Sequence, residues 1–183
     1  IMKGYYKNPE ANAEVFDGDW FKTGDLGRID GEGYIHITGR KKEIYVLSGG
    51  KNVAPLVVEE TMKSIPVISQ VFLVGDGRKF CSALVTLDVG VILRDNLGMN
   101  PDKVPRDPME QIEELERRGH KLSDFVESEE VRSDIESQIS ELNKRFMNPE
   151  QIKKFTILPR DLNIDSGELT PTLKIRRKQI REN

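Results

Sequence analysis

Apolar residues recur at helical spacing in two stretches of the chain. In the longer stretch they follow one another at steps of four, four, three and four, at Val131, Ile135, Ile139, Leu142 and Phe146. This spacing predicts an amphipathic helix that ends at Asn148-Pro149. In the shorter stretch, Pro55 can open a helix that is expected to end before Pro66. The apolar face of this helix would consist of Val58, Met62 and Ile65.

Runs of β-branched and other apolar residues predict a set of strands. The clearest runs are Val67–Gly75, Lys79–Asp88 and Lys153–Leu158. Asp76-Gly77-Arg78 joins the first two runs, and an Asp-Gly pair in this position predicts a β-hairpin. Residues 43–47 are expected to form one more strand, and the glycine turn Ser48-Gly49-Gly50 follows it.

The region between the second and third of these strands is mostly polar. A helix is expected through Ile92 and should end near Gly98, and three prolines predict a loop over residues 100–108. Residues 107–141 hold twelve acidic and four basic residues. Blocks of charge of this kind usually form solvated faces.

Turn signals and short alternating runs dominate the first forty residues. Asn8-Pro9 is one such turn signal, and Asp30-Gly31, which precedes the alternating run Tyr34–Ile37, predicts a hairpin. The whole pattern predicts an α+β fold. A small mixed sheet flanked by helices is expected over residues 41–183, preceded by a short β-rich piece at residues 1–40.

Composition excludes several classes of protein. The chain of 183 residues has 28 Lys and Arg against 31 Asp and Glu, a net charge of −3, so no nucleic-acid partner is expected. Nowhere does an apolar run approach the length of about 18 residues that a membrane span needs, so no transmembrane segment is expected. The one cysteine, Cys81, lies in an apolar run, which favours a buried structural thiol in a reducing compartment.

The two histidines do not indicate a catalytic or metal site. His36 and His120 lie far apart in the sequence, and neither has a Cys or His at metal-ligand spacing. No metal site is therefore expected. His36 alternates with Ile35 and Ile37, which favours an exposed position on a strand.

Three short strings carry residue types suited to a nucleotide. In Trp20–Leu26, Asp25 follows a glycine turn, and its carboxylate could accept hydrogen bonds from two neighbouring hydroxyls or bond its own turn. In Gly39–Glu43, three consecutive bases could face a phosphate or form a solvated hinge between domains. In Gly167–Arg177, Lys174 could stabilise a developing oxyanion or belong to a basic tail.

In this order and at this spacing, the strings resemble motifs of the adenylate-forming enzymes, which include acyl-CoA synthetases, luciferases and peptide-synthetase adenylation domains. The Thr-Gly-Asp, hinge and C-terminal lysine motifs of that family resemble Thr23–Asp25, Gly39–Lys42 and Pro171–Arg177. Within the family, Gly49–Pro55 and Leu169–Lys174 look most similar to long-chain fatty acid–CoA ligases. Many other members carry glycine before the lysine, where this chain has Leu173.

The resemblance implies a two-step reaction and a role for three matched residues. Family members join a carboxylate to ATP, which gives an acyl-adenylate and pyrophosphate, and then pass the acyl group to the thiol of CoA. Lys174 would be catalytic, because its charge would bridge the α-phosphate and the attacking carboxylate in the first step. Asp25 and Arg40 would bind the ribose hydroxyls and the phosphate of ATP or AMP.

The resemblance also implies a C-terminal domain that moves between the two steps. Lys42 matches the hinge about which residues 41–183, the lid, would rotate. Gly49 and Gly50 would then line the path of CoA, where side chains would obstruct it. Mg²⁺ would accompany ATP and be bound mainly by the large N-terminal domain.

Other parts that the family needs are not found in this sequence. The phosphate loop and the acyl pocket belong to the large N-terminal domain, and residues 1–40 resemble only its end. The chain is therefore expected to be a C-terminal fragment, inactive alone, whose partners are its own N-terminal domain, a fatty acid, ATP and CoA. The cytoplasm is the expected location, and a lipid substrate is compatible with peripheral membrane contact.

Two other interpretations remain open. An adenylating enzyme could pass its acyl group to a carrier-protein thiol or use molecular oxygen, and CoA dependence separates these cases. Alternatively, a non-catalytic lid domain could stand alone and bind a partner through the acidic face at residues 107–141.

Overall fold

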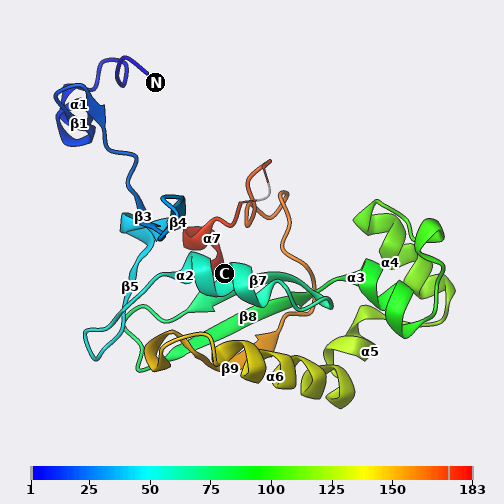
Figure 1. The fold of residues 1–183 in the computed structure, drawn as a ribbon. Coiled ribbons are helices and arrows are strands. Elements are labelled where there is room, and N and C mark those ends of the chain that lie inside the picture. The colour runs from blue at the N-terminus through cyan, green and yellow to red at the C-terminus, as the bar shows by residue number, and fades with distance from the viewer. Residues whose placement is uncertain (1, 173, 183) are drawn as a thin grey trace. The chain divides into compact units, whose positions relative to one another are not determined.

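The chain divides into two units, Ile1–Ile44 and Tyr45–Asn183. The computed structural model describes residues 2–172 and 174–182 (Figure 1). Helices combine with a small mixed sheet and short β-hairpins, which confirms the predicted α+β class. The assignment of residues 1–40 to the end of a larger domain stays a prediction.

The first unit contains one short helix and two antiparallel hairpins. Asn8 caps the helix α1 (Pro9–Val15) by accepting a hydrogen bond from the Ala11 amide, so the expected turn at Asn8-Pro9 begins a helix. The hairpins are formed by β1 (Phe16–Asp17) with β2 (Trp20–Phe21), and by β3 (Asp25–Ile29) with β4 (Ile35–Arg40). The second hairpin confirms the one predicted around Asp30-Gly31. A 3₁₀ helix at Lys41–Glu43 follows it.

The second unit is built on a three-stranded sheet with the strand order β7–β8–β9. Its strands are β7 (Ile68–Val74), β8 (Cys81–Leu87) and β9 (Ile152–Ile157). β7 and β8 are antiparallel, which confirms the predicted hairpin across Asp76-Gly77-Arg78. β8 and β9 are parallel, with Ala83 opposite Phe155, because the chain crosses over through a long helical region between them.

A two-stranded ladder precedes this sheet. β5 (Tyr45–Val46) pairs with β6 (Asn52–Val53) around the turn that contains Gly49 and Gly50. The expectation of a strand over all of residues 43–47 is wrong at its first residues, because Lys41–Glu43 form the 3₁₀ helix.

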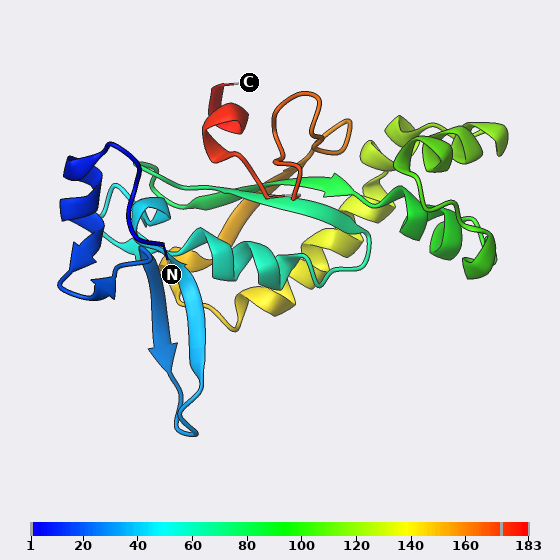
Figure 2. The ribbon, with the colours of Figure 1, turned by 90° about the horizontal axis from the view of Figure 1, so that it is seen from above.

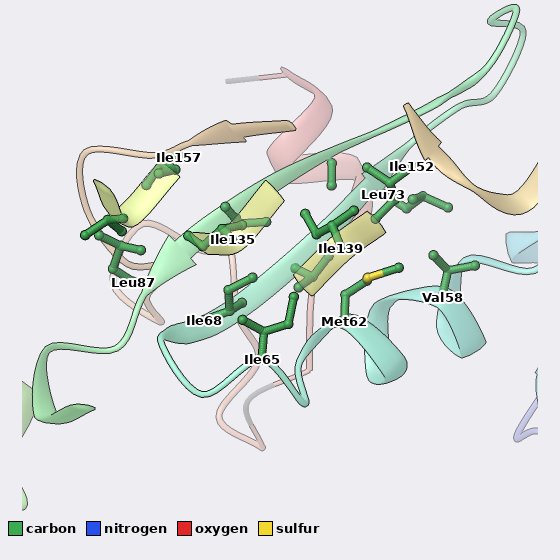
Figure 3. Close-up of a cluster of buried hydrophobic side chains, with 14 of the residues drawn as sticks. Val58, Met62, Ile65, Ile68, Leu73, Leu87, Ile135, Ile139, Ile152 and Ile157 are labelled. Atoms are coloured by element: carbon green, nitrogen blue, oxygen red, sulfur yellow. The ribbon is translucent and has the colours of Figure 1, made fainter. Parts of the chain in front are cut away.

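Two helices cover one face of the sheet, and their inner side chains form the core. α2 (Pro55–Met62) and α6 (Glu129–Asn143) pack against each other and against the strands (Figure 3). The predicted apolar faces are confirmed, since their central residues are buried: Val58, Met62, Ile65, Val131, Ile135 and Ile139. α6 ends at Asn143, before the predicted end, because the Asn143 side chain forms two hydrogen bonds with the backbone of Ile152.

The acidic region between β8 and α6 contains helices that the apolar pattern did not predict. α3 (Val89–Val91) continues into a π-helical turn at Ile92–Asn96, and Gly98 follows, close to the predicted helix end. The remaining elements are a 3₁₀ helix (Pro101–Lys103), α4 (Pro108–Arg117) and α5 (Leu122–Val126). Asp107 begins α4 by accepting hydrogen bonds from the amides of Met109 and Glu110.

The other face of the sheet carries the C-terminal part of the chain. After the 3₁₀ helix Asn148–Glu150 and β9, the chain passes to the side opposite α2 and α6 and ends in α7 (Arg177–Glu182), as Figure 2 shows. Every helix among the described residues is too short or too polar to cross a membrane.

Two single-residue expectations are confirmed. Cys81 is fully buried, its thiol donates to the Pro149 carbonyl at 3.3 Å, and burial raises its pKa to about 11. It is therefore a structural thiol. His36 is exposed on β4, with its Nε2 2.6 Å from the Asp30 carboxylate.

Candidate active-site loop and nucleotide-binding residues

Lys174 lies in a small loop at residues 168–176, called the lysine loop below. The Arg176 amide donates to the Glu168 carbonyl at 2.8 Å, and the Thr170 amide donates to the Lys174 carbonyl at 2.8 Å. The Lys174 amide in turn donates to Thr170 Oγ1 at 3.0 Å. These bonds close the loop across its base and leave Lys174 exposed. Leu173, which the sequence analysis singled out, lies outside the described residues.

The first end of the lysine loop is held by the ion pair between Glu168 and Arg160. Two nitrogens of the guanidinium each lie 2.8 Å from a carboxylate oxygen. The Glu168 side chain, 6% exposed, also accepts from Ser166 Oγ at 2.6 Å. The Arg160 guanidinium lowers the pKa of Glu168 most, and Ser166 Oγ and the Asn163 amide lower it further. Together they outweigh desolvation, which would raise the pKa, and bring it from 4.5 to about 2.

The second end of the loop is held by the ion pair between Arg177 and Glu59 of α2. Nη1 and Nη2 lie 2.7 and 2.6 Å from the two carboxylate oxygens. The side chains are 15% and 4% exposed. Glu59 also accepts from the Leu73 amide of the edge strand β7 at 2.7 Å. The guanidinium lies over the rings of Tyr45 and Phe72, 6.0 and 5.7 Å from their centroids.

Asp161 ties the segment before the lysine loop to the sheet. Its carboxylate accepts from Thr86 Oγ1 of β8 at 2.5 Å and from Ser69 Oγ of β7 at 2.6 Å. It also accepts from the Leu162 amide at 2.8 Å. The chain that leads to the loop is therefore fixed to two strands by a polar network.

Gly49 and Gly50 form the tip of the turn between β5 and β6. The Gly50 amide donates to the Leu47 carbonyl, and Gly50 has φ = +73°, a conformation that favours glycine. A Cβ added at Gly49 would meet no described atom within 4 Å. Packing within the described residues therefore gives no reason for glycine at position 49.

The first unit brings Asp25 and Arg40 together, as their positions in the β3–β4 register require. Arg40 Nε lies 3.2 Å from Asp25 Oδ1, and the Asp25 side chain is about one third exposed. The Asp25 amide donates to Thr23 Oγ1 at 3.1 Å, so Thr23 stabilises the turn and the carboxylate faces Arg40. Lys42 lies in the 3₁₀ helix, with its Nζ 3.5 Å from Glu14 on α1.

Sequence reasoning missed the carboxylates that support the lysine loop. Glu59 lies beside Val58 on the predicted apolar face of a helix, and an acid at such a position needs a partner. That signal could have identified Glu59, but its partner is 118 residues away. The described residues contain no group of three or more His, Cys, Asp and Glu side chains that could hold a metal ion.

The family of AMP-binding enzyme C-terminal domains matches residues 42–123. Among named relatives, the long-chain-fatty-acid–CoA ligase FadD15 of Mycobacterium tuberculosis is 38% identical over the whole chain. The human long-chain-fatty-acid–CoA ligase ACSBG1 is 37% identical, again over the whole chain. The chain spans only 28% and 26% of the lengths of these two relatives.

Solved structures of adenylating enzymes share the fold. The adenylation domain of a carboxylic acid reductase from Segniliparus rugosus, solved with AMP and a co-purified carboxylic acid, superposes with a TM-score of 0.69 and 25% identity. The match covers 100% of this chain and 25% of that one. O-succinylbenzoate CoA synthetase from Bacillus subtilis, solved with AMP, superposes with a TM-score of 0.58 and 22% identity, covering 100% and 28%.

Proposed function

From the match of residues 42–123 to the family of AMP-binding enzyme C-terminal domains, we propose that the full-length protein is an ATP-dependent long-chain fatty acid–CoA ligase. The observation that carries the proposal is the 37–38% identity, over the whole chain, to ligases of that class from a bacterium and from human. Because the chain spans about a quarter of those relatives, it would supply one part of the active site.

The proposed reaction has two steps. A carboxylate oxygen of the fatty acid attacks the α-phosphorus of ATP, and the bond to pyrophosphate breaks. The thiolate of CoA then attacks the carbonyl carbon of the acyl-adenylate, and the carbon–oxygen bond to AMP breaks. Negative charge gathers on the phosphoryl oxygens in the first step, so a positioned cation stabilises that transition state more than the ground state.

Lys174 is the proposed catalytic residue of the first step. Its side chain is exposed on the lysine loop. Hydrogen bonds close the backbone of this loop, and an ion pair holds each of its two ends. A flexible ammonium on a fixed backbone position can reach a ligand phosphate and still present three hydrogen-bond donors.

Asp25 and Arg40 are the proposed ribose and phosphate contacts. Their ion pair holds the carboxylate at the start of β3 and leaves it partly exposed, so that it can accept hydrogen bonds from vicinal hydroxyls. Arg40 neutralises the carboxylate beside it through Nε, and a guanidinium carries further N–H donors that suit a phosphate oxygen.

The second step would require the lid to rotate about Lys42. Gly49, which has no packing reason to be glycine among the described residues, is the proposed contact along the CoA path, together with Gly50. The described residues contain no cluster that fits a metal ion, so Mg²⁺ is assigned to ATP in the remaining domain and no step here depends on it.

The first unit supports the view that a larger domain continues around it. Ile29, Ile35 and Ile37 share one face of the β3–β4 hairpin and are 71%, 72% and 57% exposed. When three neighbouring β-branched side chains lie on one face of a sheet, another part of the protein usually covers them. We therefore propose that residues 1–40 are the end of the large adenylation domain and that the isolated chain is inactive.

A second candidate function differs only in the acceptor. The likeness in fold to the adenylation domain of a carboxylic acid reductase, with a TM-score of 0.69, is compatible with an acceptor other than CoA, such as a carrier-protein thiol. Such an enzyme would form acyl-adenylate without responding to CoA.

The test is AMP formation by the full-length protein with ATP and palmitate, with and without CoA. The proposed function predicts multiple turnovers only when CoA is present, and no AMP from the isolated 183 residues. AMP formation at the same rate with and without CoA would indicate that the acyl acceptor is another thiol. The absence of any fatty-acid adenylation would refute the ligase assignment.

A further inference from the structure

The lysine loop is held at both of its ends by a two-fold hydrogen-bonded ion pair. Glu168 at the first end is bound by Arg160, and Arg177, one residue beyond the second end, is bound by Glu59. Both carboxylates are almost fully buried. Lys174 lies between these ends, three residues before Arg177, and its backbone amide and carbonyl bond to Thr170.

The direction in which Lys174 points therefore depends on where the two ends are fixed. Within the loop, the bond from the Arg176 amide to the Glu168 carbonyl joins the ends to each other. The attachment of the joined ends to the sheet comes from outside the loop. On the Arg177 side that attachment is Glu59, which is itself fixed by the Leu73 amide of β7.

A buried ion pair is a costly way to attach a helix of six residues. Desolvation of both charges offsets much of their attraction, so an apolar pair of similar volume would hold α7 about as well. The planar fork of a guanidinium on a carboxylate, however, fixes orientation as well as distance. The same guanidinium also lies over the rings of Tyr45 and Phe72, and these contacts restrict it further.

We propose that Glu59 and Arg177 are positioning residues for Lys174: their ion pair sets the place of the lysine loop for the adenylation step. The inference rests on the proposed function. Neither residue touches substrate in it, and both act through Lys174. A displacement of a catalytic group by about 1 Å can cost about 100-fold in rate, so a modest loosening of the loop is enough to matter.

A purely structural anchor would behave differently from a positioning pair. Loss of an anchor weakens the whole unit and therefore slows both half-reactions. Lys174 is assigned only to the first half-reaction, so a change that acts through Lys174 slows adenylation and spares thioester formation from added acyl-adenylate. In addition, such a change causes no further loss of adenylation rate in a protein that already lacks the Lys174 side chain.

The experiment uses the full-length protein with the variants Arg177→Lys and Glu59→Gln, each alone and combined with Lys174→Ala. Arg177→Lys keeps a cation beside Glu59, and Glu59→Gln keeps the shape of the side chain, so both are designed to preserve the fold. The matched controls are Arg94→Lys and Asp95→Asn, which alter a half-exposed ion pair in the π-helical turn after α3. Palmitate-dependent ATP–pyrophosphate exchange measures the first step, and CoA thioester formation from synthetic palmitoyl-adenylate measures the second.

Each variant is expected to slow the first step by about 10- to 100-fold. The second step and both control variants are expected to stay within about threefold of wild type, as is usual for exposed pairs. Adding either variant to Lys174→Ala should cause no further loss. Hydrogen exchange at the amides of residues 168–176 should be faster in Glu59→Gln, with the amides of β8 unchanged.

Two results would overturn the inference while the proposed function stands. One is an active wild type in which the variants slow both steps equally; the other is a loss that multiplies with that of Lys174→Ala. Unchanged exchange at residues 168–176 in Glu59→Gln would count against it in the same way. A wild type that forms no palmitoyl-adenylate would refute the proposed function, and the inference with it.

Discussion

At the scale of single residues, Glu168 is the carboxylate whose charge the fold stabilises most clearly. Its pKa lies at about 2 in the folded chain, because Arg160 and two other donors, Ser166 Oγ and the Asn163 amide, favour the ionised form. A carboxyl group with a depressed pKa contributes stability above its unfolded pKa of 4.5, and that contribution is lost as the pH falls toward 2. The lysine loop is thus fixed by a group that stays charged at every physiological pH.

We predict that the wild-type chain loses on the order of 3 kcal/mol more stability than Glu168→Gln between pH 4.5 and pH 2. Urea unfolding at a series of pH values measures the difference. Glu141→Gln, which alters an exposed pair with Lys144, is the control and should follow the wild type. Identical acid profiles for wild type and Glu168→Gln would contradict the assigned role of Arg160.

At the scale of elements, the sequence pattern predicted those helices and hairpins whose formation depends on residues close together in the chain. The spacing of Val131, Ile135 and Ile139 predicted α6, and Asp76-Gly77 predicted the β7–β8 hairpin, because periodicity and turn chemistry are encoded within a few residues. The sequence analysis did not predict α1 and α4, because Asn8-Pro9 and the prolines of residues 100–108 suggest a turn and a loop, although a capping Asn or Asp followed by proline can equally begin a helix.

The residues of the candidate site also fall into two groups, those that a local motif indicates and those that only the fold brings together. The motif strings located Asp25, Arg40 and Lys174, and the β3–β4 register explains why the first two meet. The ion pair of Arg177 with Glu59 joins positions 118 residues apart, and no local pattern reports such a contact. Non-local partners therefore required the fold.

Gly49 and Gly50 give a prediction for the turn between β5 and β6. Gly49→Leu should leave folding and adenylation near wild type, because a Cβ added there meets no described atom within 4 Å, and should slow CoA thioester formation in the full-length protein. Gly31→Leu is the matched control, since that position is equally open, and should affect neither step.

The same half-reaction assays as above, with thermal unfolding, measure the effect. Gly50→Leu provides a contrast: it should destabilise the turn by about 1–2 kcal/mol, because only glycine adopts its left-handed conformation without strain. A Gly49→Leu protein with a normal CoA step would remove Gly49 from the proposed CoA path.

At the scale of the whole molecule, the proposed function makes the chain one part of a larger active site. It spans about a quarter of its relatives, and the apolar face of the β3–β4 hairpin is exposed. The groups that the chain would contribute to this site are Lys174 on its anchored loop, the Gly49-Gly50 turn, and Asp25 paired with Arg40.

The measurement that tests the central claim most directly is the split of the two half-reactions in Lys174→Ala of the full-length protein. The account predicts that palmitate-dependent ATP–pyrophosphate exchange falls by about 10²–10³-fold, as for loss of one oxyanion donor, while synthetic palmitoyl-adenylate and CoA still react at a rate near wild type. Adenylation that survives the substitution, or an equal loss in both steps, would contradict the assignment of Lys174 as the catalytic residue of acyl-adenylate formation.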